Sequence, residues 1–427
     1  MMKFQKRKMH FLKWGSRRKK GFRVYPERGD SGKYLYLKRK GRRPLKIIWR
    51  KFKMNVLVIY GGRSGEHEIS LVSASSIVRG LKNENVILVG ISKEGKWFLQ
   101  DTKEVSRILT DENAVLNLVE DEKNLVSVIP GGKENSFFCG GKSFSVDVVF
   151  PVLHGTYGED GTIQGLLEML DIPFVGCTTL SSSLTMDKEK TKQVLEVSGL
   201  PVVPYVCIKR CDLLNSFRYD EVINKAVETL GFPIFVKPCC AGSSIGASRS
   251  ENLKELSFAL MEAFSWDDKV LLEKAVNARE IECSVTGNSV SYPADSETQI
   301  VKAYIPGEIL PTHKFYDYDA KYSDPSGADL IIPADLSQDL IETIRATAVK
   351  AYCALDCSGL SRVDFFIDKD SGDLYLNEIN TMPGFTSISM FPKMCEAAGL
   401  KFEELTSLLI SEALSRYESK KKLLTSR

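Results

Sequence analysis

The sequence predicts a protein that combines α/β and α+β regions. Between residues 54 and 180, the apolar runs 55–60, 86–92 and 146–153 alternate with helical patterns. Such alternation is typical of a parallel sheet covered by helices. Further along, residues 361–380 form two strand patterns around the turn residues Lys369 to Gly372. We therefore expect a parallel α/β domain followed by mixed regions that contain antiparallel strands.

The 427 residues are long enough for two to four domains. Residues 186–276 alternate short strands and helices, which suits a small α+β domain. The predicted regions are a basic extension (1–53), an α/β domain (54–180), a central α+β subdomain (181–276) and a C-terminal mixed domain (277–427).

The basic extension has a large excess of positive over negative charge. Residues 1–53 contain 21 Lys and Arg against two acids, a net charge of +19, so the remainder carries −16. The segment has too few apolar residues to form a core, and we expect it to be disordered. Because Met54 directly precedes the first strand, translation could start there. The alternatives are a tail that binds nucleic acid or a membrane, and a tail without a role.

The composition argues against a membrane protein and a secreted protein. No apolar run approaches the ~20 residues needed to cross a bilayer, and the N-terminus lacks the apolar stretch of a secretory signal. The ten cysteines form no Cys-x-x-Cys pair and no zinc-type cluster. We expect reduced thiols and a cytoplasmic protein.

The strands around residue 371 predict a metal site. If the hairpin is centred near Ser371, Asp364 lies opposite Glu378 and Arg362 opposite Asn380, all on one face. Two opposed carboxylates repel each other unless a cation lies between them, and two carboxylates with an amide oxygen suit Mg²⁺. The alternative is the solvated polar face of an ordinary hairpin.

Two further segments have the character of a phosphate site. Lys237 ends an apolar strand just before the small-residue loop Cys-Cys-Ala-Gly-Ser-Ser-Ile-Gly, where backbone N–H groups could approach phosphate oxygens. The connection after Glu273 could meet an adenine edge, with Glu280 on the ribose hydroxyls, although both could be ordinary surface glutamates. The polar, aromatic loop 311–329 is interpreted as a lid that closes over phosphates through Lys321.

The chain resembles the D-alanine–D-alanine ligase family of the ATP-grasp superfamily. The resemblance covers residues 54 to about 420 and rests on blocks in a fixed order: GGRSGEHEIS, LHGTYGEDG, MDKEKTK, FVKP with GSSIG, LLEKAVNAREIE, FYDYDAKY, SRVDFF and LNEINTMPGFTSISMFP. It implies an ATP-grasp fold, the substrates ATP and D-alanine, two Mg²⁺ or Mn²⁺ ions and a homodimer.

The resemblance also implies a role for individual residues. The residues implied at the nucleotide are Lys188, Lys237, Ser243, Glu273, Lys274, Val276, Glu280 and Lys321. Those implied to bind the metal ions are Asp364, Glu378 and Asn380. Those implied at the amino-acid substrates and in catalysis are Glu66, His154, Ser243, Tyr322, Arg362, Gly384, Ser389 and Met390. Within this last set, Glu66, Ser243 and Tyr322 would latch the lid, and Arg362 with the Gly384 N–H would hold an oxyanion.

The implied reaction is ATP-dependent ligation of two D-alanine molecules through an acyl phosphate, for peptidoglycan precursor synthesis. Tyr322 within an intact lid block favours D-alanine as the second substrate, with D-lactate or D-serine as the alternatives. Two other readings remain, a nucleic-acid-associated protein that acts through its tail and a regulatory pseudo-enzyme. Cys239 and Cys240 beside the phosphate loop depart from the family pattern, and an oxidation-sensitive site is possible there.

Overall fold

The computed structural model describes residues 22–29, 32–39, 53–214, 216–290, 301–311, 328–386 and 389–424. The chain forms two compact units, Met1–Lys53 and Met54–Arg427. In the first unit, β1 (Phe22–Gly29) pairs antiparallel with β2 (Gly32–Arg39). We expected this segment to be disordered, whereas in the structure residues 22–29 and 32–39 form strands. The alternation of Tyr and Leu in β2 favours extended structure.

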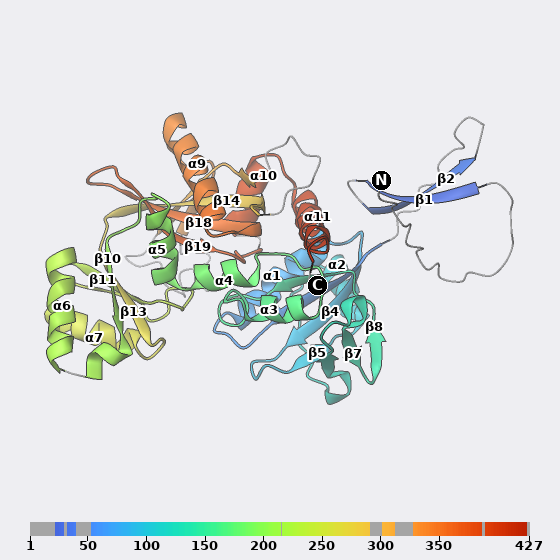
Figure 1. Ribbon diagram of the computed structural model, residues 1–427, viewed down its shortest axis with the longest axis horizontal. Coiled ribbons are helices and arrows are strands. Elements are labelled where there is room, and N and C mark those ends of the chain that lie inside the picture. Colours follow the sequence, from blue (N-terminus) through green and yellow to red (C-terminus); the bar gives the residue numbers. More distant parts are fainter. Residues whose placement is uncertain are drawn as a thin grey trace, which may run out of the picture. The chain divides into compact units, whose positions relative to one another are not determined.

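The second unit begins with a parallel α/β domain (Figure 1). Its main sheet has the order β5-β4-β3-β9, in which β3 pairs parallel with both β4 and β9, and β5 is an antiparallel edge. The elements are β3 (Asn55–Gly61), α1 (His67–Gly80), β4 (Asn85–Ile91), β5 (Trp97–Leu99), α2 (Thr102–Thr110), η1 (Glu122–Asn124), β6 (Val126–Val128), η2 (Lys133–Asn135), β7 (Phe137–Cys139), β8 (Lys142–Phe144), β9 (Val148–Val152) and α3 (Thr162–Met169).

The central strand β3 shows why this sheet is covered on both faces. Val56, Val58 and Tyr60 pack in one core with α1, whereas Leu57 and Ile59 pack in another with α3. Successive side chains of a strand point to opposite faces, so a continuous apolar run requires two covered faces. Because β3 and β9 are parallel neighbours, the loops that follow them emerge at the same edge of the sheet.

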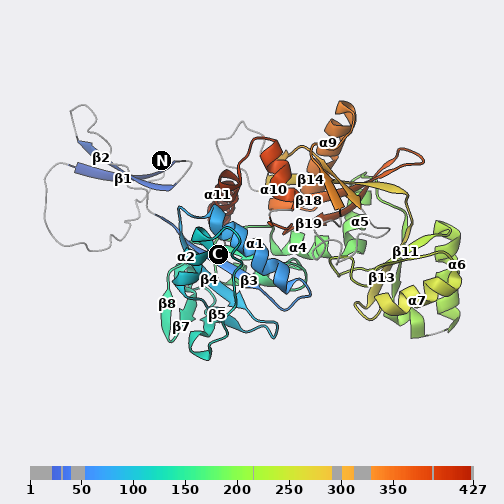
Figure 2. The same cartoon turned by 180° about the vertical axis from the view of Figure 1, so that it is seen from behind.

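Two helices, α4 (Thr179–Met186) and α5 (Lys188–Val197), lead into the central subdomain. Its sheet has the order β10-β13-β11-β12 with antiparallel pairing throughout. Figures 1 and 2 show α6 and α7 beside this sheet at one end of the unit. The elements are β10 (Tyr205–Lys209), η3 (Arg210–Leu214), α6 (Ser216–Leu230), β11 (Ile234–Pro238), β12 (Ser248–Ser250), α7 (Leu253–Ala263) and β13 (Lys269–Lys274).

The C-terminal region is built on a six-stranded antiparallel sheet with the order β17-β16-β14-β18-β19, and β15 also pairs with β14. Helix α9 packs on one face of β14 and β18. The elements are β14 (Ala278–Asn288), β15 (Val301–Ala303), β16 (Gly307–Pro311), β17 (Ala328–Ile331), α9 (Gln338–Ala354), β18 (Ser358–Asp368), β19 (Leu374–Asn380), α10 (Met390–Ala397) and α11 (Phe402–Lys420). The predicted loop 311–329 therefore has strand residues at both ends.

The hairpin β18–β19 has the predicted register at its functional end. Arg362 pairs with Asn380 and Asp364 with Glu378. Beyond this point the register shifts, so that Phe365 pairs with Leu376 and Asn377 is the extra residue of a β-bulge. The bulge was not predicted, and it adds Asn377 to the functional face of the hairpin.

Helix α11 fastens the C-terminal region to the α/β domain. The Arg416 guanidinium donates to the carbonyl oxygens of Gly176 and, at 2.8 Å, Phe174, and to the Ser358 hydroxyl at 2.6 Å. It also lies 4.7 Å from the centroid of the Phe174 ring. One side chain therefore joins the segment after α3 to the first residue of β18.

We predict that Arg416→Met lowers the free energy of unfolding by about 2–4 kcal/mol, because it leaves backbone carbonyl groups without a donor. Lys420→Met on the same helix is the control. Lys420 makes an exposed pair with Glu168 at 3.1 Å, and its loss should cost less than about 1 kcal/mol. Urea unfolding followed by circular dichroism measures both, and equal effects would contradict this role of Arg416.

Candidate active site

A cavity of about 350 Å³ lies between the central sheet and the hairpin β18–β19. Its walls come from the start of α5, β11, the loop 241–247, the end of β13 with its following connection, β14 and β19. The predicted site residues that line it are Lys188, Lys237, Ser243, Glu273, Lys274, Val276, Glu280, Glu378 and Asn380. Residues that are far apart in sequence thus share one space.

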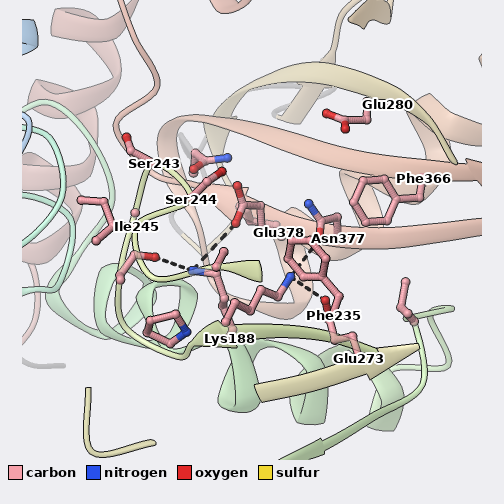
Figure 3. Close-up of a pocket in the computed structure, with 18 of the residues that line it drawn as sticks. Lys188, Phe235, Ser243, Ser244, Ile245, Glu273, Glu280, Phe366, Asn377 and Glu378 are labelled. Carbon is pink, nitrogen blue, oxygen red and sulfur yellow. Dashed lines mark hydrogen bonds and ion pairs between the residues drawn. The ribbon is translucent and has the colours of Figure 1, made fainter. Parts of the chain in front are cut away.

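Lys188 spans the cavity from α5 toward the hairpin (Figure 3). Its ammonium donates to the carbonyl oxygen of Ala241 at 2.7 Å and lies 3.9 Å from a Glu378 carboxylate oxygen. Its backbone N–H donates to the Cys239 carbonyl at 3.1 Å. The helix start and the loop after β11 are therefore held together, with a cation between the loop and the carboxylate.

Lys237 and Glu273 share the face of the central sheet that is turned toward the cavity. On β11, Ile234 and Val236 pack in the core under α6 and α7, so the alternate residue Lys237 projects to the other side. The Lys237 ammonium lies 2.6 Å from Oε2 of Glu273 and donates to Oδ1 of Asn377 at 3.3 Å. The resemblance implies that Glu273 lies at the nucleotide, and in the structure its carboxylate contacts Lys237 in the cavity wall.

The loop 241–247 joins the central subdomain to the α/β domain. Ser243 and Ser244 have positive φ values of 50° and 58°, and the Ser243 hydroxyl donates to Glu66. A Cβ atom at Gly155 would lie 2.5 Å from Oε2 of Glu66, and Gly155 has a φ of 69°, so this position favours glycine. Two members of the predicted latch are thus in contact. Its third member, Tyr322, lies outside the described residues, as does Lys321.

The functional end of the hairpin is a network of opposite charges. Nε of Arg362 lies 2.7 Å from Oδ1 of Asp364 and 3.1 Å from Oε2 of Glu282, and its terminal nitrogen lies 2.5 Å from Oδ2 of Asp364. Asn380 donates to Oδ2 of Asp364 at 2.9 Å. Burial favours the neutral form of Arg362, but Asp364 and Glu282 outweigh it and raise the pKa well above its ordinary value. Arg362 thus stays charged, and a metal ion would compete with it for Asp364.

The donor set fits a divalent cation that arrives with a phosphate ligand. Asp364, Glu378 and Asn380 supply two carboxylates and an amide oxygen within one hairpin. Among the described residues, no three His, Cys, Asp or Glu side chains gather as a protein-only metal site would need. Mg²⁺ is usually held by one or two carboxylates together with substrate phosphates, which matches this set.

His154 lies behind the cavity in a buried hydrogen-bond chain. Its Nδ1 is 2.9 Å from the Met382 carbonyl oxygen and its Nε2 is 2.9 Å from the Ser73 hydroxyl. Burial lowers the pKa of His154, although the charge of Glu66 opposes this. The neutral His154 ring therefore joins α1 to the segment after β19, and both of its nitrogens already have protein partners.

The remaining substrate residues gather at the start of α10. Ser389 caps this helix and its Oγ accepts from the Thr386 N–H at 3.0 Å. A Cβ atom at Gly384 would lie 2.6 Å from that Oγ. The Met390 side chain is buried with Ile309, so only its backbone could meet a substrate.

In the wall of the cavity, the Lys274 N–H already donates to the Pro204 carbonyl, so it is not offered to an adenine.

The structure adds residues that sequence analysis missed, namely Glu159, Lys192, Glu282 and Asn377. Glu159 lines the cavity and accepts from the N–H groups of Gly155 at 2.9 Å and Met382 at 3.0 Å. Burial, reinforced by the charge of Glu66, raises its pKa to about 8. Sequence analysis could have found Glu159 because it lies in the same family block, LHGTYGEDG, as His154.

The cysteines beside the phosphate loop are poorly suited to oxidation. Burial and the charge of Asp267 raise the pKa of Cys240 to about 12. Contact with Cys207, together with burial, raises the pKa of Cys239 further. Thiols that stay protonated react slowly with oxidants, which argues against the predicted redox sensitivity.

Comparisons with known proteins agree with this architecture. Residues 55–177 match the family described as D-ala D-ala ligase N-terminus, and residues 194–411 match its C-terminus. The chain belongs to the D-alanine–D-alanine ligase family. Its relatives include the D-alanine–D-alanine ligase of Treponema denticola, which is 54% identical over 376 residues that span 88% of this chain and 100% of the relative. The ligase of Thermoanaerobacter pseudethanolicus is 43% identical over 86% of this chain and 98% of that protein.

Solved ligase structures share the fold. The D-alanine–D-alanine ligase of Coxiella burnetii superimposes with a TM-score of 0.71 at 33% identity, covering 87% of this chain and 96% of that one. The VanG D-Ala:D-Ser ligase of Enterococcus faecalis gives 0.70 at 34% identity, covering 85% and 100%. These ligases have the ATP-grasp fold, so the predicted fold class is confirmed.

We predict that Glu159→Gln changes how stability depends on pH. The folded-state pKa of about 8 lies above the ordinary 4.5, so the stability contributed by the protonated carboxyl is lost as pH rises from about 4.5 through 8. Glutamine does not titrate. The free energy of unfolding of the variant, relative to that of the unmodified protein, should therefore rise with pH by up to about 1.4 kcal/mol per pH unit. Melting temperatures of the two proteins, measured across this pH range, show the trend. Glu122→Gln, an exposed control, should show no such trend.

Proposed function

We propose that the protein ligates two D-alanine molecules to D-alanyl-D-alanine, with conversion of ATP to ADP and phosphate, for peptidoglycan precursor synthesis. Membership of the family implies ATP use and a divalent metal ion. The observation that supports the reaction best is the pair of lysines, Lys188 and Lys237, facing the hairpin carboxylates across one cavity. Binding a triphosphate requires cationic side chains and a metal ion. The two lysines supply the cationic groups, and the hairpin carboxylates could hold the metal ion.

The chemistry would proceed in two steps. A carboxylate oxygen of the first D-alanine attacks the γ-phosphorus of ATP, the bond to the bridging oxygen breaks, and ADP leaves. The amine of the second D-alanine then attacks the acyl carbon and loses a proton, and phosphate leaves as the peptide bond forms. Most of the rate acceleration in such reactions comes from positioning and charge neutralisation.

We assign the groups as follows. Lys188 and Lys237 would hold phosphate oxygens, and Glu66 would hold the ammonium of the first D-alanine. Asp364, Glu378 and Asn380 would bind two Mg²⁺ or Mn²⁺ ions, which neutralise phosphate charge when bound. Arg362 would stabilise the oxyanion of the second step. We propose that Lys321 and Tyr322 close the site and exclude water from the acyl phosphate.

We further propose that the protein works as a cytoplasmic homodimer. All ten cysteines are free thiols, which suits a reducing compartment. Within the described ranges, no helix combines the length and the apolar character needed to cross a membrane. The proposed domain boundaries at 53, 180 and 276 also remain predictions.

A substrate panel tests the function. Purified protein is given ATP and Mg²⁺ with D-alanine alone, L-alanine alone, or D-alanine plus D-lactate or D-serine, and phosphate release and product mass are measured. D-alanyl-D-alanine as the product of D-alanine alone supports the proposal. Release that requires D-lactate or D-serine would keep the mechanism but change the acceptor. No release by folded protein with any substrate would contradict ligase function.

We predict that Glu378→Gln reduces turnover on the order of 100-fold or more, because the variant keeps the size of the side chain but loses its charge at the phosphates. Asp373→Asn is the control, since Asp373 lies at the exposed turn of the same hairpin, where it accepts from Ser371 at 2.8 Å. Initial rates across a range of Mg²⁺ concentrations measure the effect. Near-normal turnover of Glu378→Gln would contradict the hairpin metal site.

A further inference from the structure

Lys192 is a buried cation that the proposed mechanism does not use. It lies one turn after Lys188 on α5, its side chain is 1% exposed, and it is not part of the cavity wall. Its ammonium lies 2.6 Å from Oε1 of Glu273 and donates to the Val203 carbonyl at 3.3 Å. It also lies 5.5 Å from the centroid of the Tyr205 ring. A buried lysine is costly unless it is paired, so its pairing requires a reason.

The partner of Lys192 is shared with the cavity. Oε1 of Glu273 faces Lys192 and Oε2 faces Lys237, each at 2.6 Å, and the Glu273 side chain is 3% exposed. Lys192 and Glu273 therefore form a buried ion pair. The order from the protein interior to the cavity is therefore ammonium, carboxylate, ammonium.

This order controls the net charge that the cavity wall presents. Glu273 and Lys237 alone would form a neutral pair, and an arriving phosphate would have to compete with Glu273 for the Lys237 ammonium. With Lys192 behind it, the same carboxylate belongs to a group of net charge +1. Burial would raise the pKa of Glu273, but Lys192 and then Lys237 hold it below its ordinary value. The carboxylate therefore remains charged and fixed.

We propose that Lys192 is a positioning residue that balances the charge of Glu273, so that Lys237 remains available to nucleotide phosphates. The inference rests on the proposed function, because it assumes that a nucleotide occupies the cavity. Lys192 itself touches no ligand in this account. Its effect reaches the phosphates through Glu273 and Lys237.

The test is nucleotide binding by the full chain, measured by calorimetry with MgADP and with adenosine. Lys192→Met keeps the length of the side chain and removes its charge. We expect the dissociation constant for MgADP to rise at least about tenfold and that for adenosine to change less than about threefold. In assays of ligation, the KM for ATP should rise more than kcat falls. Lys190→Met is the matched control, since Lys190 lies on the same helix with a side chain 47% exposed and should leave MgADP binding unchanged.

A double variant separates charge balance from simple packing. In Lys192→Met/Glu273→Gln, Lys237 is again the single net charge, so MgADP binding should recover most of the loss seen in Lys192→Met. A purely structural role of Lys192 predicts no such recovery. If Lys192→Met fails to fold, the double variant is compared with the unmodified protein: MgADP binding within about threefold supports the inference, and a loss of about tenfold or more by folded double variant overturns it.

The outcomes separate this inference from the proposed function. If the unmodified protein bound neither MgADP nor MgATP, the proposed function itself would fail. If it bound MgADP and Lys192→Met bound equally tightly, the inference alone would be wrong. A parallel loss of adenosine and MgADP binding, or a double variant that binds no better than Lys192→Met, would overturn it as well.

Discussion

The site depends on charges of opposite sign that the fold holds apart across one cavity. Lys188 and Lys237 project from α5 and the central sheet, whereas Asp364 and Glu378 project from the hairpin of the C-terminal sheet. The Lys188 ammonium lies 3.9 Å from a Glu378 carboxylate oxygen, a looser ion pair than the 2.6 Å contact between Lys237 and Glu273. A triphosphate with its metal ion supplies charge of both signs and fits between the walls. The walls therefore offer cationic and anionic groups to a ligand, although Lys237 and Asp364 also have close protein partners, Glu273 and Arg362.

Holding the walls in place requires contacts between parts of the chain that are distant in sequence. The Ser243 hydroxyl in the loop 241–247 donates to Glu66, and Glu159 accepts hydrogen bonds from Gly155 in the loop after β9 and from Met382 after β19. Arg416 ties the last helix to the α/β domain. Except for the local bond between Gly155 and Glu159, each contact joins two domains through polar groups. A small displacement of one domain would therefore change the positions of the side chains that line the cavity.

Much of the site could be predicted because its residues follow local rules. Strand periodicity and a turn centred near Ser371 were enough to pair Asp364 with Glu378, and the structure has that register. The bulge at Asn377 was beyond such arithmetic, which assumes one residue opposite one residue; with the bulge, Leu376 pairs with Phe365 and is fully buried. Lys192 lies in a highly charged helix and resembled a surface residue. It is buried against Glu273, an ion-pair partner 81 positions further along the chain on β13.

The sequence predicted which residues lie in the site better than it predicted what each side chain contacts. Resemblance named Glu273 as a nucleotide residue, and the structure places it in the cavity wall but directs its carboxylate to Lys192 and Lys237. Likewise, Arg362 was assigned to an oxyanion, and here its guanidinium lies against Asp364 and Glu282. A motif fixes which residues meet in space. Which partner each one takes is set by the surrounding charges, and those come from other elements.

The most direct test of the account is the fate of the carboxylate oxygens of the first substrate. D-Alanine labelled with ¹⁸O in its carboxyl group is ligated, and the phosphate released is analysed by mass spectrometry. If the cavity activates the carboxylate by phosphorylation, each phosphate carries one ¹⁸O from D-alanine, and the peptide carbonyl keeps the other. Phosphate without ¹⁸O, formed alongside D-alanyl-D-alanine, would contradict an acyl phosphate and with it the role assigned to this cavity.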